Sequence, residues 1–152
     1  MKQQVFSHNL PQLFLKARDS LMAHFRPVLH HFGLTEQQWR IMRVLDEHAQ
    51  LEPREICDMC LMLSSSMAGM LARMEEMDLI SRQRMPEDQR RVMVRLTPHG
   101  IKIMRQMVTL IDQQYQHLEQ AIGKPALKNL VASLESFIAA EHETVSQVDL
   151  PG

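Results

Sequence analysis

The sequence predicts a mainly α-helical fold that carries one small β-hairpin, and three observations support this. The chain of 152 residues has 13 Met but only 5 Gly and 5% aromatic residues. Such a composition favours helices over β-sandwiches, barrels and Gly-rich nucleotide-binding folds. Apolar residues recur every three or four positions over most of the chain, whereas residues 79–96 alternate with a period of two. The length suits one domain.

The first predicted helix runs from Leu10 to Phe32. Its apolar residues fall at steps of three and four on one helical face, and Gly33 is suited to end it. Pro27 lies inside this run, where it lacks a backbone N–H and clashes with the preceding turn. We therefore expect a long helix that is kinked or broken near residues 23–26.

Three shorter helices follow in close succession. Thr35 and Gln38 form a capping-box pattern that opens a helix reaching about His48, and a second helix spans residues 52–59. The serines at 64–66 offer N-caps for a third helix, whose apolar stripe consists largely of methionine. Because only about four residues join the last two helices, they predict a helix-turn-helix.

The alternating stretch at 79–96 predicts a β-hairpin with a polar tip. Thr97 and Pro98 open a long helix that Gly123 ends, and Pro125 opens a final helix. The predicted order is therefore four helices, a hairpin and two helices, which makes six helices in all.

A helix-turn-helix followed directly by a hairpin is the winged-helix arrangement. Its second helix enters the major groove of DNA, and its hairpin contacts the backbone or the minor groove. The net charge is only -1, but residues 81–95 hold five Arg against two acids, a local charge of +3. Arginine suits phosphates and a narrow minor groove. Alternatively, these charges only keep the hairpin edge from pairing with other strands.

The candidate DNA contacts lie on the second helix of this motif and on the hairpin. The three serines place hydroxyls at a positive helix end, which suits a phosphate or a base edge, although ordinary N-capping would also explain them. Gly69, in mid-helix, would allow close approach either to the groove or to another helix. The full candidate set is Ser64, Ser65, Ser66, Arg73, Arg82, Arg84, Asp88, Arg90 and Arg91.

Three motifs resemble the wing signature of the MarR family of winged-helix repressors. They are Leu-Ile-Ser-Arg at 79–82, Asp-Gln-Arg at 88–90 and Leu-Thr-Pro-His-Gly at 96–100. Residues 34–45 also resemble the second-helix motif of the family. Within the family, residues 25–45 look most like the branch that represses operons for homoprotocatechuate and 4-hydroxyphenylacetate degradation.

The resemblance implies a homodimer that binds a pseudo-palindromic operator in double-stranded DNA. Residues 1–34 and 98–152 would supply the dimerisation helices, and residues 35–97 would form the DNA-binding lobe. The sequence independently permits a dimer, because the apolar stripes of the first and last helices exceed what one lobe could cover.

The family pattern also implies roles at the wing. Asp88 would orient Arg90 for insertion into the minor groove. Arg82 and Arg91 would contact phosphates.

Three positions depart from the family pattern. Asp78 stands where the family usually has Gly before the wing, and Ala68 and Gly69 occupy recognition-helix positions that are commonly polar. We therefore expect base readout from the serines and Arg73 instead.

Members of the family commonly bind small aromatic carboxylates as effectors, and such a ligand needs an aromatic wall and a cation. Trp39 and Arg43 are one helical turn apart, so they share a face. We expect Arg18 or Arg43 to bind the carboxylate, and His24 or the indole N–H to bind a ring hydroxyl. Alternatively, Trp39 is a core anchor, and the arginines of its helix bind DNA phosphates or surface acids. The candidate effector residues are Arg18, His24, Trp39, Arg40 and Arg43.

Other functions find weaker support. Cys57 and Cys60 have a redox- or metal-motif spacing, but nothing completes a zinc site, so structural cysteines are favoured. A thiol- or metal-responsive regulator, or a helical protein-interaction module without DNA binding, stays the alternative. No motif indicates an enzyme, and no cofactor is expected. The sequence shows neither a bilayer-length apolar run nor a signal pattern, so we expect no membrane partner and a cytoplasmic location.

Overall fold

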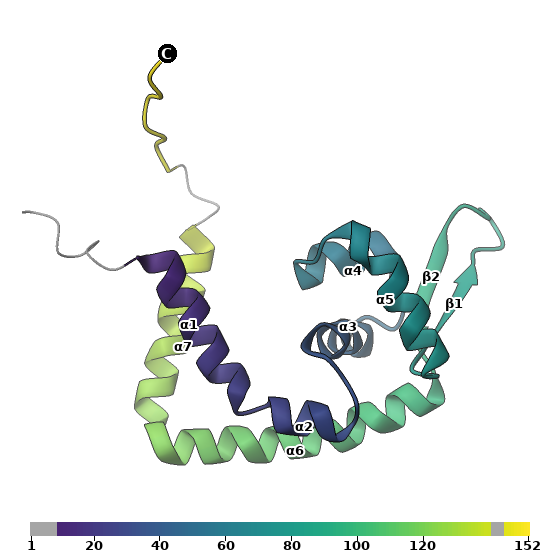
Figure 1. The fold of residues 1–152 in the computed structure, drawn as a ribbon, viewed down its shortest axis with the longest axis horizontal. Helices are drawn as coiled ribbons and strands as arrows, with labels where there is room; N and C mark the ends of the chain where they lie inside the picture. The colour runs from purple at the N-terminus through teal and green to yellow at the C-terminus, as the bar shows by residue number, and fades with distance from the viewer. Residues whose placement is uncertain (1–8, 141–144) are drawn as a thin grey trace, which may run out of the picture. The chain divides into compact units, whose positions relative to one another are not determined.

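The computed structural model describes residues 9–140 and 145–152, and in these ranges it contains seven helices and a two-stranded antiparallel sheet (Figure 1). The elements in order are α1 (Leu10–Ala23), α2 (Arg26–His31), α3 (Glu36–Glu47), α4 (Pro53–Cys60), α5 (Ser64–Glu76), β1 (Ile80–Arg84), β2 (Val92–Leu96), α6 (Pro98–Ile122) and α7 (Lys124–Ala139). The predicted helical fold with one hairpin is confirmed. The chain divides into two compact units, one reaching to Asp112 and one beginning at Gln113.

The described chain has one helix more than the six predicted, because the first predicted helix is two. α1 ends at Ala23 and α2 begins at Arg26. Pro27 lies in the first turn of α2, where its missing N–H costs no helical hydrogen bond. At the break, the N–H groups of His24 and Phe25 bond to carbonyl oxygens three residues back. The break falls where Pro27 predicts it.

α3 begins with the predicted capping box. The Gln38 backbone N–H donates to the Thr35 hydroxyl at 3.1 Å, and the Thr35 N–H donates to the Gln38 side-chain oxygen at 3.0 Å. The two bonds satisfy donors that the first turn of a helix leaves unpaired. Because the box is buried at Gln38, it also holds the start of α3 against the core.

The turn between α4 and α5 is short and tight. Leu61 ends α4 in the left-handed conformation (φ 53°), and the Met62 N–H bonds to the Cys57 carbonyl oxygen at 3.0 Å. The N-cap of α5 is Leu63, so the prediction that a serine caps this helix is wrong. The serines instead form the first turn, and the Ser66 hydroxyl donates back to the Leu63 carbonyl oxygen at 3.1 Å.

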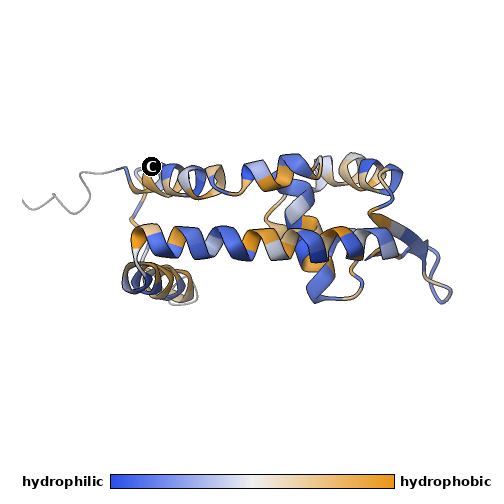
Figure 2. Ribbon diagram, turned by 90° about the horizontal axis from the view of Figure 1, so that it is seen from below, coloured by the Kyte–Doolittle hydropathy of each residue, from blue (hydrophilic) through white to orange (hydrophobic). Residues whose placement is uncertain are grey.

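The hairpin is regular and joins the helical core on one side. Ile80 pairs with Leu96 and Arg84 pairs with Val92, so the register carries no bulge between these ends. Residue Leu51, before α4, bridges to Val94 through backbone bonds of 3.0 and 2.8 Å. The projecting tip is hydrophilic (Figure 2). We call the segment from β1 to β2 the wing.

The base of the wing is closely packed. Asp78 has a φ of 56°, a left-handed conformation that explains why glycine is usual at this position. The Leu79 carbonyl oxygen accepts from the Thr97 N–H, and a Cβ atom placed on Gly100 would overlap this same oxygen. The Thr97 hydroxyl accepts from the Gly100 N–H at 2.9 Å, which confirms Thr97 as the cap of α6.

One continuous core holds the helix-turn-helix and the wing together. It takes side chains from α2 to α5, from both strands and from the start of α6. Its fully buried large residues are Leu29, Ile41, Met42, Leu45, Ile56, Leu71, Met74, Ile80, Met104, Met107 and Val94. The buried methionines of α5, Met67 and Met74, therefore belong to the core. Trp39 packs against this core and stays partly exposed.

Two helices, α1 and α7, have no buried residue. α1 exposes Leu13 and Leu15, and α7 exposes Leu130, Val131 and Ile138. Within the described residues no single helix is long and apolar enough to cross a membrane. The pair α4 and α5 passes that test only when taken together, and it is bent by 111°.

Candidate nucleic-acid interface and ligand site

α5 presents two opposite faces. Met67, Leu71 and Met74 are buried in the core, while the three serines, Ala68, Gly69 and Arg73 are exposed. Nothing lies within 4 Å of a Cβ placed on Gly69, so close helix packing does not explain this glycine. The exposed face is therefore small and hydrogen-bonding, with one cation near its end. Such a face suits insertion into the major groove.

The wing tip carries an arginine that is both exposed and oriented. The Arg90 Nε donates to Asp88 Oδ1 at 3.1 Å, and the Arg90 backbone N–H donates to the same oxygen at 3.1 Å. These bonds hold the pKa of Asp88 below its usual range. The Arg90 side chain is nevertheless 92% exposed. Asp88 thus orients a guanidinium that still projects into solvent, as the family pattern implies.

The other wing arginines are engaged within the chain. Arg82 pairs with Glu75 of α5, Arg91 pairs with Glu52 before α4, and Arg84 donates to the Gln89 carbonyl oxygen at 2.6 Å. The predicted phosphate contacts Arg82 and Arg91 therefore each have a carboxylate partner. Sequence reasoning missed both glutamates, because no sequence motif contains either glutamate together with its arginine partner.

The helix carrying Trp39 places one arginine over the ring. The Arg43 Cζ lies 5.9 Å from the Trp39 ring centroid, a cation–π distance. Among the residues that the structure describes, the one ion pair of Arg43 is with Glu47 at 3.7 Å, and both side chains of this pair are about half exposed. An exposed pair this long contributes little. Arg43 is thus available to a carboxylate beside the indole.

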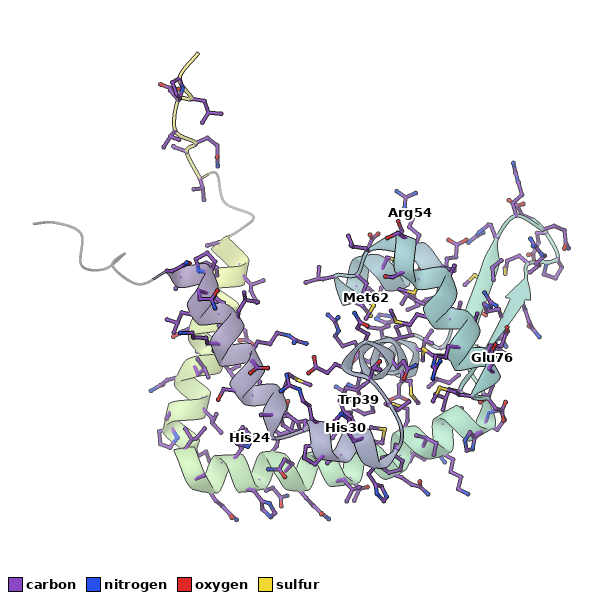
Figure 3. All side chains as sticks on the ribbon, viewed as in Figure 1. His24, His30, Trp39, Arg54, Met62 and Glu76 are labelled. Carbon is purple, nitrogen blue, oxygen red and sulfur yellow. The ribbon has the colours of Figure 1, made fainter. Side chains whose placement is uncertain are left out.

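The other candidate effector residues are less available. Arg18 donates to Glu36 at 3.1 Å, and Arg40 donates to the Cys60 carbonyl oxygen at 2.8 Å. His24 lies exposed where α1 meets α2, whereas Trp39 lies on α3 (Figure 3). The described contacts therefore join Trp39 to Arg43 but do not join His24 to either.

A charge network that the sequence did not reveal links α1, α2 and α3. Arg26 donates to Asp19 at 2.6 Å and to Glu36 at 2.9 Å, and Glu36 also accepts from Arg18. Burial acts to raise the pKa of Glu36, but the hydrogen bonds from Arg26 and Arg18 lower it overall. We call these four residues the corner network. It ties both helices of the broken N-terminal segment to the start of α3.

The two cysteines are free and buried. Burial raises the pKa of the Cys60 thiol, although the Arg40 charge acts in the opposite direction. Because the thiolate is the reactive form, a raised pKa lowers reactivity.

Comparison with known proteins places this arrangement in a family. The MarR family profile matches residues 34–92, which run from the capping box into the wing. The chain is also 36% identical to the HTH-type transcriptional regulator FarR of Neisseria gonorrhoeae, over 79% of this chain and 84% of that relative. The chain belongs to the MarR family.

Two other MarR-type proteins are similar over nearly the whole chain. The homoprotocatechuate degradative operon repressor of Escherichia coli is 34% identical over 91% of this chain and 92% of its own length. The crystal structure of NadR in complex with 4-hydroxyphenylacetate is 31% identical with a TM-score of 0.74, covering 88% of this chain and 100% of NadR. The resemblance seen in the sequence is confirmed, and this MarR-family chain is a winged-helix transcriptional regulator.

Proposed function

We propose that this regulator is a homodimeric repressor that binds a pseudo-palindromic operator and is released by a small aromatic carboxylate. The observations that carry the DNA-binding part are the exposed Arg90 held by Asp88 at the wing tip and the small exposed face of α5. In this proposal α5 enters the major groove and Arg90 enters the adjacent minor groove.

The DNA contacts divide by type. Ser64, Ser65 and Ser66 lie at the positive end of α5 and would bind phosphate or base edges, while Arg73 would reach the groove farther along the helix. Arg84 would contact the backbone. Arg82 and Arg91 are assigned to phosphates by the family pattern, and their glutamate partners give them a second role within the wing.

The dimer would form through the first and last helices of the two copies. The exposed Leu130 and Ile138 of α7 and the exposed leucines of α1 support this assignment, because such apolar area favours association. We expect Leu130→Glu to shift the molar mass measured by light scattering from dimer towards monomer. Lys128→Glu, a charge change on the same helix, serves as the control and should stay dimeric.

The effector would bind beside Trp39. Arg43 is the preferred cation, because Arg18 and Arg40 already have short bonds within the chain. The ligand class is supported by NadR, whose structure contains 4-hydroxyphenylacetate, and by the name of the Escherichia coli repressor. His24 would contact the ligand only if the ring reached the junction of α1 and α2.

The test is a fluorescence-anisotropy titration with the DNA upstream of the protein's own coding sequence. A DNA-binding dimer loses affinity steeply as salt rises. Saturating 4-hydroxyphenylacetate or homoprotocatechuate should weaken that binding, and unchanged affinity with both ligands would contradict the effector assignment.

The remaining assignments follow from this role. A repressor of this kind acts on DNA in the cytoplasm and catalyses no reaction, and the relatives are likewise named as regulators. A thiol-responsive mechanism is not favoured, because both cysteines are buried and the Cys60 pKa is raised.

A further inference from the structure

Two acidic residues contact the wing, a part of the molecule where a DNA-binding protein would be expected to avoid negative charge. Glu75 is next to last in α5, and Glu52 is the N-cap of α4. Each forms an ion pair with an arginine of the wing. Their shared contact with the wing suggests that both residues have the same structural role.

Glu75 holds the first strand of the wing through both of its oxygens. The Arg82 Nη2 donates to Glu75 Oε1 at 3.0 Å, and the Arg82 backbone N–H donates to Oε2 at 3.3 Å. The hydrogen bond from the Arg82 side chain is the main cause of the lowered pKa of Glu75. Because one of the two donors is the backbone of β1, the contact fixes the strand itself and not only a flexible side chain.

Glu52 holds the other strand. The Arg91 Nε donates to Glu52 Oε1 at 2.7 Å, the shortest carboxylate contact of the wing arginines in the described chain. Arg91 comes directly before β2, so this bond ties the strand to the start of α4. Together the two ion pairs connect the wing to both helices of the helix-turn-helix.

The base of the wing packs into the core, but nearer the tip a cleft lies between the wing and these helices. The cleft, of about 660 Å³, is lined by α4, by the N-terminal half of α5, and by Arg82 and Val92 of the two strands. A hairpin that borders such a hollow has few apolar contacts there to fix its angle. The ion pairs at the two sides of this cleft therefore add to the packed base of the wing in holding its outer half.

We propose that Glu75 and Glu52 are positioning residues for operator binding, which hold the wing at the angle that delivers Arg90 to the minor groove while α5 lies in the major groove. The inference rests on the proposed DNA-binding function and adds to it. Neither carboxylate touches the DNA, and each acts through the arginine it holds.

The proposal and simple electrostatics predict opposite changes in operator affinity when one of these carboxylates is removed. Removing a negative charge close to a polyanion should strengthen binding. Removing a carboxylate that positions the wing should weaken it. The chain supplies a matched control, because Glu76 adjoins Glu75 at the end of α5 (Figure 3), is exposed, and forms no ion pair with any described residue.

The experiment measures the affinity of the full-length protein for its upstream DNA at fixed salt. Glu76→Gln should bind as tightly as the wild type or more tightly. Glu75→Gln and Glu52→Gln should each bind about fivefold more weakly than Glu76→Gln, which is the upper range for a partly exposed ion pair. The dimer mass of each variant should match that of the wild type, and its melting temperature should fall by no more than a few degrees, the loss expected for one partly exposed ion pair.

Two further measurements separate positioning from general loss of structure. In the Arg82→Gln background, Glu75→Gln should cause no further loss, because the pair is already broken. Hydroxyl-radical footprinting should show lost protection of the minor groove under the wing, while protection of major-groove guanines from methylation persists.

The outcomes distinguish the two proposals. If the wild type does not bind its upstream DNA, the proposed function fails and this inference fails with it. If the wild type binds and Glu75→Gln binds as tightly as Glu76→Gln, the positioning role is wrong while the function stands. Equal loss of minor-groove and major-groove protection would likewise overturn it.

Discussion

The wing and the corner network both pair arginines with carboxylates, but only the wing leaves a guanidinium almost fully exposed. In the wing, Arg82 and Arg91 are held by carboxylates, and Arg90 is oriented by Asp88 yet 92% exposed. In the corner network, Arg18 and Arg26 are both bound to Glu36, and neither arginine is more than half exposed. One region is built to present a cation, and the other is built to hold helices together.

The difference shows that an arginine-rich segment is not one functional unit. Whether a guanidinium binds a ligand or supports the fold depends on the carboxylate beside it. Asp88 is two residues from Arg90, so it can only orient the guanidinium. Glu52 lies 39 residues from Arg91 and therefore connects two separate elements. We accordingly propose ligand contact for Arg90 and Arg43. For Arg82 and Arg91, whose partners lie on other elements, we propose a structural role beside the phosphate contacts.

The largest expected effect is at the base of the wing. Gly100→Ala should destabilise the fold by about 3 kcal/mol, because the new Cβ would overlap the Leu79 carbonyl oxygen and force the backbone apart. Gly69→Ala, where the space is open, should instead raise stability by about 1 kcal/mol. Urea unfolding of the two variants measures this contrast. Equal stability would show that the wing base is not rigid.

Removing the exposed guanidinium of Arg90 should have the next largest effect, on operator affinity. Arg90→Ala should weaken operator binding about 10- to 100-fold, because a minor-groove guanidinium would be lost. Arg18→Ala, in the corner network, should leave operator affinity in the absence of effector nearly unchanged. Anisotropy titrations check both variants. Similar losses would remove the distinction between the two regions.

At the effector site we expect a smaller effect, and there the affinity for the effector changes while the affinity for the operator does not. Arg43→Gln should weaken binding of 4-hydroxyphenylacetate about tenfold, because a charge-assisted bond to the carboxylate is lost. Operator affinity should change little. Calorimetry measures the ligand affinity, and Arg54→Gln, at an exposed arginine on the next helix, α4, is the matched control. If Arg18→Gln had the larger effect, the carboxylate would bind in the corner network instead.

The smallest effect concerns pH. The lowered pKa of Glu36 means that its ionised form stabilises the fold above its ordinary pKa, and that this contribution is lost as pH falls through the lowered value. Glu36→Gln removes this titration. The urea midpoint of the wild type should therefore fall more steeply in acid than that of the variant. Parallel curves would show that the corner network adds nothing to stability.

Much of the fold could be predicted because its signals are local. Pro27 breaks the first helix, Thr35 and Gln38 cap α3, and Thr97 caps α6, each through groups within four residues. The serine prediction was wrong for an equally local reason. The tight turn at Leu61 uses fewer residues than expected, so Leu63 takes the N-cap position and the serines enter the helix.

The candidate site was predicted less completely than the fold. The Asp88–Arg90 pair was found because its spacing belongs to a motif. Glu52, Glu75 and Glu36 were missed as partners. The residues next to a glutamate in the sequence do not show which arginine on another element it will contact. The pairing of Trp39 with Arg43 was found because both lie on one face of one helix.

The sequence by itself determined the order of helices, the hairpin, the family and the arginine-rich wing, because periodicity, caps and motifs act over a few residues. Only the tertiary structure decided which arginines are held by carboxylates on other elements. An ion pair depends on two side chains meeting within about 4 Å, and for Arg91 and Glu52 that meeting follows from how the wing folds back on α4. The charge of the wing could therefore be predicted from the sequence, but the carboxylate partner of each of its arginines on another element could not.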